Sequence, residues 1–333
     1  MEQPRNVSWS EIQTWCACRM KWRWAYEVNI VPKRFKWAPS VGSCGHVAIA
    51  AFLQGKDWAQ AVERWLEKEI TRKALFDEEI DEYRKAADLI LGIVPRYIES
   101  YRDDFRPVLV EHKFEIPVRG TKMKLIGYWD AIVMDRDGHL WLLEHKFPKQ
   151  FRSDNDLDLD GQIGVYQYAA RRLGYPIVGT IYNQLLNRLP AIPEINKDGS
   201  VSRKAAIYTD WKTYSDFVVS QGLNPDDYRE MEDKLTGRYA FFQRNYIYRP
   251  LIETRLFARD MERRIWDMRK SKKHVYRSEF FIICGWCPYR ELCLESLKGG
   301  DIDHIIENDF EQKTSREEKQ NDYEIDEIPT TES

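Results

Sequence analysis

The sequence predicts an α/β protein in which a mixed central sheet is flanked by helices. Three observations predict this class: the first third has helical periodicity, strand-like segments separated by turns follow it, and a helix precedes the last strand. Strands, then a helix, then another strand are typical of an α/β unit whose sheet has one mixed edge. The strands are expected at 108–110, 114–118, 123–134, 139–147 and 176–186.

The rest of the chain is expected to be mainly helical. Helices are predicted over 8–27, 42–54, 57–73, 77–104, 158–173, 211–238 and 249–271. Turn formers over 187–210 indicate an insertion or a long loop, whereas 240–248 has a strand-like pattern. Residues 301–333 contain few aromatics and many acids, so we expect them to be largely disordered.

Length and composition limit the class of protein. The 333 residues, of which 43% are hydrophobic, indicate a globular chain with one large or two modest domains. No apolar run approaches the ~18 residues of a membrane span, and the polar start at 1–6 lacks a signal-peptide stretch. We therefore expect a cytoplasmic protein whose six cysteines are reduced or bound to metal and not paired as disulfides.

The formal net charge of −3 is unevenly distributed. Residues 301–333 contain twelve acidic and three basic side chains, a net of −9, which leaves +6 on residues 1–300. A mildly basic body with an acidic tail fits a polyanion partner. A solvated surface with a loose tail explains the same numbers, and so small a positive charge favours that simpler interpretation when it is taken alone.

The most informative stretch is a hairpin with Asp130 on one strand and Glu144 and Lys146 on the next. Glu144 and Lys146 are two residues apart, so a strand places both on one face. The turn decides whether Asp130 joins them. A three-residue loop that ends at Gly138, in the left-handed conformation, puts Asp130 directly opposite Glu144. A two-residue loop would put it on the other face.

Two carboxylates together on a largely apolar hairpin repel one another unless a cation lies between them. Mg²⁺ or Mn²⁺, which prefer oxygen ligands, would meet that need, polarise a phosphate and generate the attacking hydroxide. Lys146 would then steady the water or the charge that develops on phosphorus. The alternative is an ordinary strand with three charged residues on a wet face, and it is favoured for this pattern taken alone.

A histidine at the start of a predicted helix is a candidate third metal ligand. His46 follows Gly42 and Gly45, and these glycines would let the backbone approach another element closely. An imidazole beside two carboxylates is a common metal ligand. A lone histidine is more often structural, so this pattern is weak without its neighbours.

The helix after the hairpin carries a second pair of polar residues. Gln162 and Tyr166 are four residues apart and therefore share a face of the 158–173 helix. That face could lie along the sheet edge near Lys146. A glutamine beside a half-buried tyrosine is the simpler interpretation of this pair alone.

Cys284, Cys287 and Cys293 form a C-x2-C-x5-C pattern. Three cysteines within ten residues of a reduced protein indicate metal binding. The spacing does not separate zinc from iron–sulfur, and burial as ordinary core residues is the alternative. The candidates for a fourth thiolate are Cys16, Cys18 and Cys44.

These motifs, in this order, resemble the RecB-like PD-(D/E)XK nucleases. The resemblance is greatest to the CRISPR-associated and phage-borne exonucleases that share an iron–sulfur staple with the nuclease domain of AddB. It spans roughly 8–295 and is loose over 187–280. The matching motifs are Gly-x-x-x-His at 42–46, Gly-x-hydrophobic-Asp at 127–130, (Asp/Glu)-x-Lys at 144–146, Gln-x-x-x-Tyr at 162–166 and the cysteine run at 284–293.

The resemblance implies a restriction-endonuclease-like fold, with a mixed central sheet flanked by helices, a helical N-terminal part and a C-terminal iron–sulfur staple. It implies one domain over 1–300, followed by the acidic tail at 301–333. The parts of that domain would be a helical part at 1–105, a catalytic α/β core at 106–186 and a helical, cluster-binding part at 187–300.

The resemblance also implies residue roles. The divalent ion would bind His46, Asp130, Glu144 and the main-chain carbonyl of His145. Lys146 would be the catalytic lysine, Gln162 and Tyr166 would shape the site and contact DNA, and Glu111 is a further candidate as an auxiliary acid. A 4Fe–4S cluster would bind Cys18, Cys284, Cys287 and Cys293. Cys18 lies eight residues after Ser10, as the family's first cluster cysteine does, but Arg19 replaces the usual following proline, so Cys16 stays open.

The implied activity is metal-dependent DNA hydrolysis by an exonuclease, on single-stranded ends and in the 5′ to 3′ direction. Recombination, DNA end processing and acquisition of fragments with CRISPR adaptation proteins are the implied settings. One competing hypothesis is a catalytically silent, DNA-binding docking module of such a complex, and another is a zinc-stapled structural protein. The intact His, Asp, Glu and Lys set favours the enzyme. The best candidates for a DNA-binding lip are Arg238, Arg244, Tyr246 and Arg249.

Overall fold

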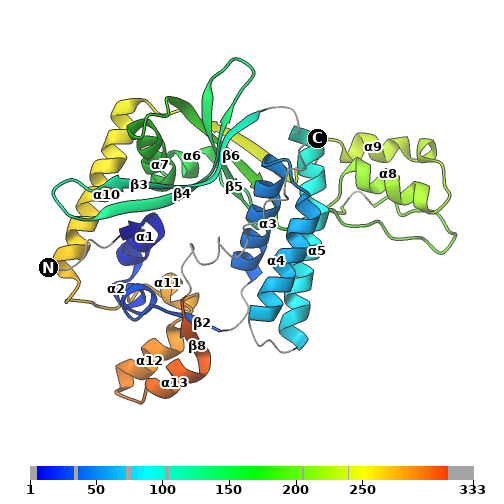
Figure 1. The fold of residues 1–333 in the computed structure, drawn as a ribbon. Helices are drawn as coiled ribbons and strands as arrows, with labels where there is room; N and C mark the ends of the chain where they lie inside the picture. The colour runs from blue at the N-terminus through cyan, green and yellow to red at the C-terminus, as the bar shows by residue number, and fades with distance from the viewer. Residues whose placement is uncertain are drawn as a thin grey trace, which may run out of the picture.

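A mixed sheet forms the centre of the molecule (Figure 1). The computed structural model describes residues 6–33, 37–72, 77–101, 105–204, 206–238 and 240–313. Among these, the strands of the six-stranded sheet are β1 (Asn6–Ser8), β3 (Arg106–Pro117), β4 (Lys124–Met134), β5 (Leu140–Lys146), β6 (Ile177–Leu185) and β7 (Phe242–Ile247).

The strand order is β1-β4-β5-β6-β7, and β3 pairs with β4. β4 is antiparallel to both β3 and β5, whereas β5 and β6 are parallel. The sheet is therefore mixed, as the sequence predicts. β1 was not expected: it pairs in parallel with the start of β4 and extends the sheet with the first residues of the described chain.

Helices cover the sheet and stand beside it. They are α1 (Trp9–Ala17), α2 (Arg19–Trp22), α3 (Trp37–Leu53), α4 (Trp58–Arg72), α5 (Asp77–Tyr101), α6 (Asp154–Asp158), α7 (Gly161–Arg172), α8 (Trp211–Ser220), α9 (Arg229–Leu235), α10 (Leu251–Ser271), α11 (Phe281–Gly285), α12 (Arg290–Lys298) and α13 (Asp303–Asp309). No described helix is both long enough and apolar enough to cross a membrane.

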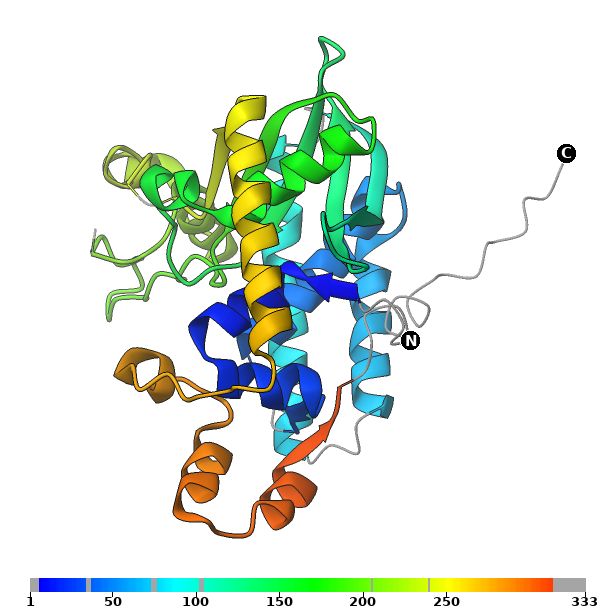
Figure 2. The ribbon, with the colours of Figure 1, turned by 90° about the vertical axis from the view of Figure 1, so that its left-hand side faces the viewer.

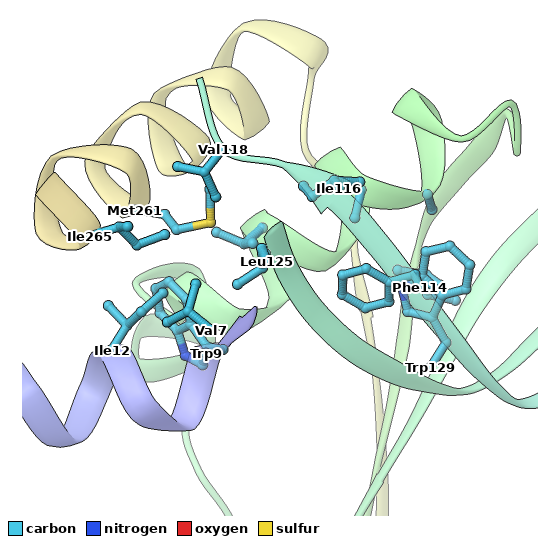
Figure 3. Close-up of a cluster of buried hydrophobic side chains, with 14 of the residues drawn as sticks. Val7, Trp9, Ile12, Phe114, Ile116, Val118, Leu125, Trp129, Met261 and Ile265 are labelled. Carbon is cyan, nitrogen blue, oxygen red and sulfur yellow. The ribbon is translucent and has the colours of Figure 1, made fainter. Parts of the chain in front are cut away.

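Two apolar cores hold these layers together. In the first, α1, α7 and α10 pack on the sheet, with Trp9, Leu125 and Met261 among the buried side chains (Figure 3). In the second, α3, α4 and α5 pack on one another and contact the ends of β5 and β6 through Phe147 and Leu185. The two cores meet at the end of β5, because Leu142 of this strand lies in the first core and Phe147, just after the strand, lies in the second.

The helix predicted over 8–27 is broken at Cys18. This residue has extended backbone (φ −162°, ψ 115°), and its sulfur accepts a hydrogen bond from the amide of Lys21 at 3.4 Å, which caps α2. The chain then continues as a π-helix, η1 (Arg23–Glu27). The uniform aromatic pattern concealed this break, because apolar residues on both sides of it remain buried.

The C-terminal segment folds back on the N-terminal one. β8 (Phe310–Gln312) pairs antiparallel with β2 (Ile30–Pro32), and the Tyr289 hydroxyl donates to the carbonyl of Ile30 at 2.7 Å. The expectation that disorder begins at 301 is therefore wrong for 301–313, where burial of Phe310 outweighs the acidic composition. The remainder of the predicted disordered tail, 314–333, lies outside the described residues.

The segment between β6 and β7 forms a separate lobe (Figure 1). The helix predicted over 211–238 divides into α8, a 3-10 turn (η2, Pro225–Tyr228) and α9. These elements enclose a small core of their own that includes Tyr214, Tyr228 and Met231. The prediction of an insertion at 187–210 agrees with this arrangement, since that stretch connects the sheet to the lobe.

Candidate active site

The β4–β5 hairpin has the register that a catalytic interpretation requires. Met134 pairs with Leu140 and Ala131 with Leu143, so the next pair inward is Asp130 opposite Glu144. The amide of Asp135 donates to the carbonyl of His139 at 3.0 Å, which closes a three-residue loop, and Gly138 has φ +86°. The three-residue alternative is thus confirmed, and the two-residue loop is excluded.

Asp130 lies almost fully buried in β4, with its carboxylate held by the chain itself. Oδ2 accepts a hydrogen bond from the amide of His145 at 2.7 Å, and His46 Nδ1 lies 3.4 Å from Oδ1. Burial alone would raise the pKa of Asp130. The His46 imidazole, the His145 side chain and the Lys146 ammonium outweigh burial and hold the pKa well below its usual range. These neighbours therefore favour the ionised form of Asp130.

Glu144 lies opposite Asp130 on β5, and its pKa is shifted in the other direction. It is equally buried, and burial, reinforced by the Asp130 charge, raises its pKa to about 7 although Lys146 acts in the other direction. Its Oε1 accepts hydrogen bonds from Lys146 Nζ and, at 3.2 Å, from Gln162 Nε2. Burial would lower the pKa of Lys146, but Glu144 and Asp130 raise it above its usual range, so the ammonium is kept charged.

Glu111 joins this group from β3. It lies between the pairs Val110–Ala131 and His112–Trp129 in the β3–β4 ladder, hence opposite Asp130. One ligand atom each from His46, Glu111 and Asp130 lie within 4.8 Å of one another. Glu111 also has φ +47°, a left-handed conformation that a non-glycine residue in a strand rarely adopts and that occurs preferentially at functional sites.

Gly45 brings His46 to the carboxylates. A Cβ at Gly45 would lie 2.1 Å from the ring of Phe147, the residue that follows Lys146, so only glycine lets α3 pack this close to the end of β5. The imidazole of His46 then meets the Phe147 ring edge-on, with centroids 6.1 Å apart. Gly42 has nothing within 4 Å of its ideal Cβ, so the expectation of close approach holds for Gly45 and is wrong for Gly42.

The N-terminus of α7 completes the site on its other side. Asp160 caps this helix, accepting from the amide of Gln162 at 2.8 Å, and is itself paired with Arg152 Nη1 at 2.5 Å. Gln162 thereby reaches Glu144, as the sequence suggests. Tyr166 lies one turn further on, where its ring meets Phe114 edge-on at 5.0 Å, and both tyrosine and glutamine line a pocket beside Glu144.

Comparison with known proteins agrees with this geometry. Residues 6–294 match the family model described as the PD-(D/E)XK nuclease superfamily. The chain belongs to that superfamily. Its mixed sheet flanked by helices is the fold of these nucleases.

Solved structures give weaker likenesses. A protein described as SSO0001 is 14% identical, with a TM-score of 0.35 over 88% of this chain and 87% of that one. A candidate exonuclease from Eubacterium rectale is 10% identical, with a TM-score of 0.33 over 68% of this chain and 81% of that one. Both scores are too low to add to the superfamily assignment. No curated protein matches the chain.

The buried side chain of His145 joins the carboxylates of this nuclease site to a polar network behind them, since its Nδ1 lies 3.6 Å from Asp130 Oδ2. His145 is fully buried, and its Nε2 lies 2.9 Å from the Tyr97 hydroxyl and 3.3 Å from Asn183 Nδ2. Arg244 continues the network: its Nε donates to Asn183 Oδ1 at 2.7 Å and its guanidinium covers the Tyr101 ring at 3.7 Å. Sequence reasoning missed this network, since its members come from four separate segments.

Two of the four residues predicted to form a DNA-binding lip do not point into solvent. Arg249 is 3% exposed and donates to the carbonyls of Leu157 and Asp158 at 2.8 Å, so its assignment to DNA is wrong. Arg244 is engaged in the network behind the site. Tyr246 is half-exposed and leans edge-on against Trp141, and Arg238 stands on the turn after α9.

The cysteine region lies where the two ends of the described chain meet. Burial raises the pKa of the Cys287 thiol, and the neighbouring Cys18 and Cys293 thiols add to this effect. Cys284 begins the same turn, because the amide of Cys287 donates to its carbonyl at 3.3 Å. By contrast, burial raises the pKa of Cys16 in a different environment, beside Arg264 and Asp267 of α10.

Cys44 is a core residue. It is fully buried between α3 and its neighbours, and burial raises the pKa of its thiol. The structure therefore brings Cys18, Cys287 and Cys293 together and leaves Cys16 and Cys44 elsewhere.

Proposed function

We propose that this nuclease is an Mg²⁺- or Mn²⁺-dependent DNA exonuclease that degrades single-stranded ends in the 5′ to 3′ direction. Recombination, DNA end processing and fragment acquisition in a CRISPR-type system are the settings that such an activity would serve. One observation carries the proposal: three metal-ligand side chains converge at Asp130, and the Glu144–Lys146 pair lies directly across the hairpin from it.

The donor set fits a divalent cation. His46, Glu111 and Asp130 offer one nitrogen and carboxylate oxygens within 4.8 Å of one another, and Glu144 adds a carboxylate from the next strand. Oxygen-rich sets with an imidazole suit Mg²⁺ and Mn²⁺. A cation would also offset the effects of burial and of the Asp130 charge, which together raise the pKa of Glu144 to about 7. We propose His46, Asp130, Glu144 and the His145 carbonyl as ligands, with Glu111 as a further acid.

The chain's own residues have distinct tasks in this scheme. When bound, the divalent ion polarises the scissile phosphate and lowers the pKa of a water. Lys146, kept protonated by its two neighbouring carboxylates, offers positive charge to the developing negative charge on phosphorus. Gln162 fixes the carboxylate of Glu144 through its hydrogen bond, and the His145 network holds β5 in register from the opposite face.

We also propose a 4Fe–4S cluster on Cys18, Cys284, Cys287 and Cys293. The proximity of three of these residues supports the proposal, because Cys18 and Cys293 lie close enough to Cys287 to act on the pKa of its thiol. The cluster would tie the ends of one unit, which we extend from 1–300 to include 301–313.

A nuclease assay tests the proposal. Anaerobically purified protein is given DNA labelled at the 5′ or 3′ end, single- or double-stranded, with Mg²⁺, Mn²⁺ or EDTA. We expect metal-dependent release of short products from the 5′ end of single strands. Lys146→Ala should reduce the rate by about 10²–10³-fold, the usual effect of removing one group that stabilises the transition state. Failure to cleave any DNA by metal-replete, cluster-bearing protein would overturn the proposal.

A further inference from the structure

A basic and aromatic segment links α10 to the cysteine region, well away from residues 238–249. Residues 269–290 contain six lysines and arginines against one acid, in a chain whose net charge is −3. Three large rings in this segment lie in solvent: Phe280 is 57% exposed, Phe281 77% and Trp286 90%. Figure 2 shows α11, which begins at Phe281, turning out to the side below α10.

The positive charges that precede these rings in the segment are not neutralised by acids. Arg269, Lys270 and Lys273 are exposed, and in the part of the chain that the structure describes none of them has a carboxylate within ion-pair distance. Arg269 and Lys270 lie over the face of Trp266, a ring that leaves their charge in place. Exposed rings alone would fit several partners. Exposed rings and unneutralised cations in one segment are the combination that binds single-stranded nucleic acid, since bases stack on the rings and phosphates pair with the cations.

A groove beside α10 adjoins the active site. It has a volume of about 260 Å³ and is lined by α1, by 152–161 and by α10 as far as Arg264, and its charged residues are Arg152, Asp160, Asp260 and Arg264. It shares Asp160 with the pocket that contains Glu144 and Gln162. Beyond Arg264, α10 rises about 1.5 Å per residue towards Arg269 and Lys270, so one helix lines the groove and carries the first of the unneutralised cations.

We propose that Phe280, Phe281 and Trp286, together with Arg269, Lys270 and Lys273, form an aromatic platform that binds single-stranded DNA. Bases of the substrate strand stack on the platform while the backbone follows α10 and the groove to the active site. The inference rests on the proposed nuclease function, because it identifies the strand as the substrate of that site. It also explains why large rings remain exposed next to a cysteine region that orders their backbone.

Binding is measured apart from catalysis. Full-length, cluster-bearing protein in EDTA is titrated against a fluorescent 20-nucleotide single strand and the matching duplex. Phe281→Ala and Trp286→Ala should each weaken single-strand binding about ten-fold, while Phe281→Trp should keep it, because each stacked base contributes a factor of this order. Lys270→Glu with Lys273→Glu should lower the slope of log affinity against log salt by about 1.4.

One control variant and two measurements separate loss of the platform from a general change in charge or loss of the fold. Lys234→Glu on α9 changes the charge at a remote exposed lysine and should bind like the parent. Iron content and melting temperature identify a Trp286→Ala protein that has lost its cluster, in which case Phe281→Ala and the lysine variants decide. Unchanged binding by these variants overturns the platform, as does parent protein that binds vesicles or protein through this surface but no single strand.

The two proposals fail in different ways. Platform variants that bind poorly yet cleave a very short oligonucleotide normally support the platform. Parent protein that binds single strands through the platform but cleaves nothing with Mg²⁺ or Mn²⁺ contradicts the nuclease proposal and leaves the platform standing. Parent protein that cleaves DNA, with platform variants that bind and cleave long strands as well as it does, contradicts the platform alone.

Discussion

The acidic site and the cysteine region both gather ligands for a metal, but the protein prepares them differently. At the acidic site, Asp130 and Glu144 accept hydrogen bonds from His145, Gln162 and Lys146 on β5 and α7. At the cysteine region, the sulfurs contact nearby backbone groups, such as Cys18 with the amide of Lys21 at 3.4 Å and Cys284 with the carbonyl of Ser278 at 4.0 Å.

This difference indicates which region needs its metal in order to fold. The hairpin is held by strand pairing and by two apolar cores, so its geometry exists without an ion. The cysteine region has a smaller core, built on Trp24, Tyr289 and Phe310, and joins segments distant in the sequence. We therefore expect metal to matter for chemistry at the first region and for stability at the second.

The largest effect is expected on cleavage at the acidic site. Glu144→Gln keeps the shape and the hydrogen bond from Gln162 but removes a ligand charge, so the cleavage rate should fall by about 10³-fold or more. Asp135→Asn is the matched control, since Asp135 belongs to the same hairpin but serves the turn through the amides of Asp137 and His139. Equal rates for the two variants would remove Glu144 from the chemistry.

The cysteine region should show the reverse pattern. Cys287→Ser should lose iron and lower the free energy of unfolding by about 4 kcal/mol, the order expected for opening a loop that spans most of the chain. That corresponds to roughly 10 °C in melting temperature. Cleavage per folded molecule should change only a few-fold, because no described cysteine lines the active-site pocket.

Cys16→Ser is the control for the cluster. Its thiol lies beside Arg264 and Asp267 of α10, so iron content and melting temperature should match the parent. If Cys16→Ser loses iron and Cys18→Ser retains it, the ligand assignment is reversed.

A smaller effect is expected from Glu111. Glu111→Gln should raise the Mg²⁺ concentration for half-maximal cleavage by about 10–100-fold while leaving the rate at saturation less affected, as for groups that support a metal site without being its main ligands. The strained backbone at φ +47° should persist in the variant because the β3–β4 ladder imposes it. An unchanged Mg²⁺ requirement would make Glu111 a structural residue.

The sequence predicts the hairpin well because its physics is local. Alternation fixes the faces of β4 and β5, and Gly138 fixes the loop, so the opposition of Asp130 and Glu144 follows from a few neighbouring residues. Motif spacing also identifies His46, whose position depends on one close packing contact at Gly45.

The rest depends on contacts between distant segments. Nothing local shows that Arg249 turns inward to the carbonyls of the α6 region, or that Tyr97 meets His145. Composition likewise gave the wrong answer for 301–313, where pairing of β8 with β2 orders a segment that is acidic on average. Contacts with distant segments, and not local conformational propensity, determine the structure of these parts of the chain.

Packing at Gly45 provides the next test of the acidic site. Gly45→Ala would force a methyl group into the Phe147 ring, so the melting temperature should fall by several degrees, consistent with the ~1–3 kcal/mol typical of overpacking, and His46 should be displaced. Gly42→Ala in the same helix meets open space and should be neutral or stabilising by about 0.5–1 kcal/mol. If Gly45→Ala melts at the same temperature as Gly42→Ala, α3 can shift away from Phe147 without loss of stability.

The last prediction concerns the pH dependence of stability in metal-free protein. The pKa of Glu144 is raised to about 7 in the folded state by burial and by Asp130, above the ~4.3 of an unfolded chain. Below about pH 4 the carboxyl is protonated in both the folded and the unfolded state, so its titration does not change the free energy of unfolding there. As pH rises towards 7 the unfolded state loses this proton first, and the folded state becomes progressively less stable.

Glu144→Gln removes this titration, so its melting temperature relative to the parent should rise between pH 5 and pH 8 in EDTA, by roughly 2–4 °C for each kcal/mol of relief. Saturating Mg²⁺ should narrow that gap by stabilising the parent's carboxylate, because an ion that binds only the folded state adds to its stability. If the melting temperatures of Glu144→Gln and the parent differ by the same amount at every pH, Glu144 does not titrate in this range. It would then be ionised without metal, beside the ionised Asp130.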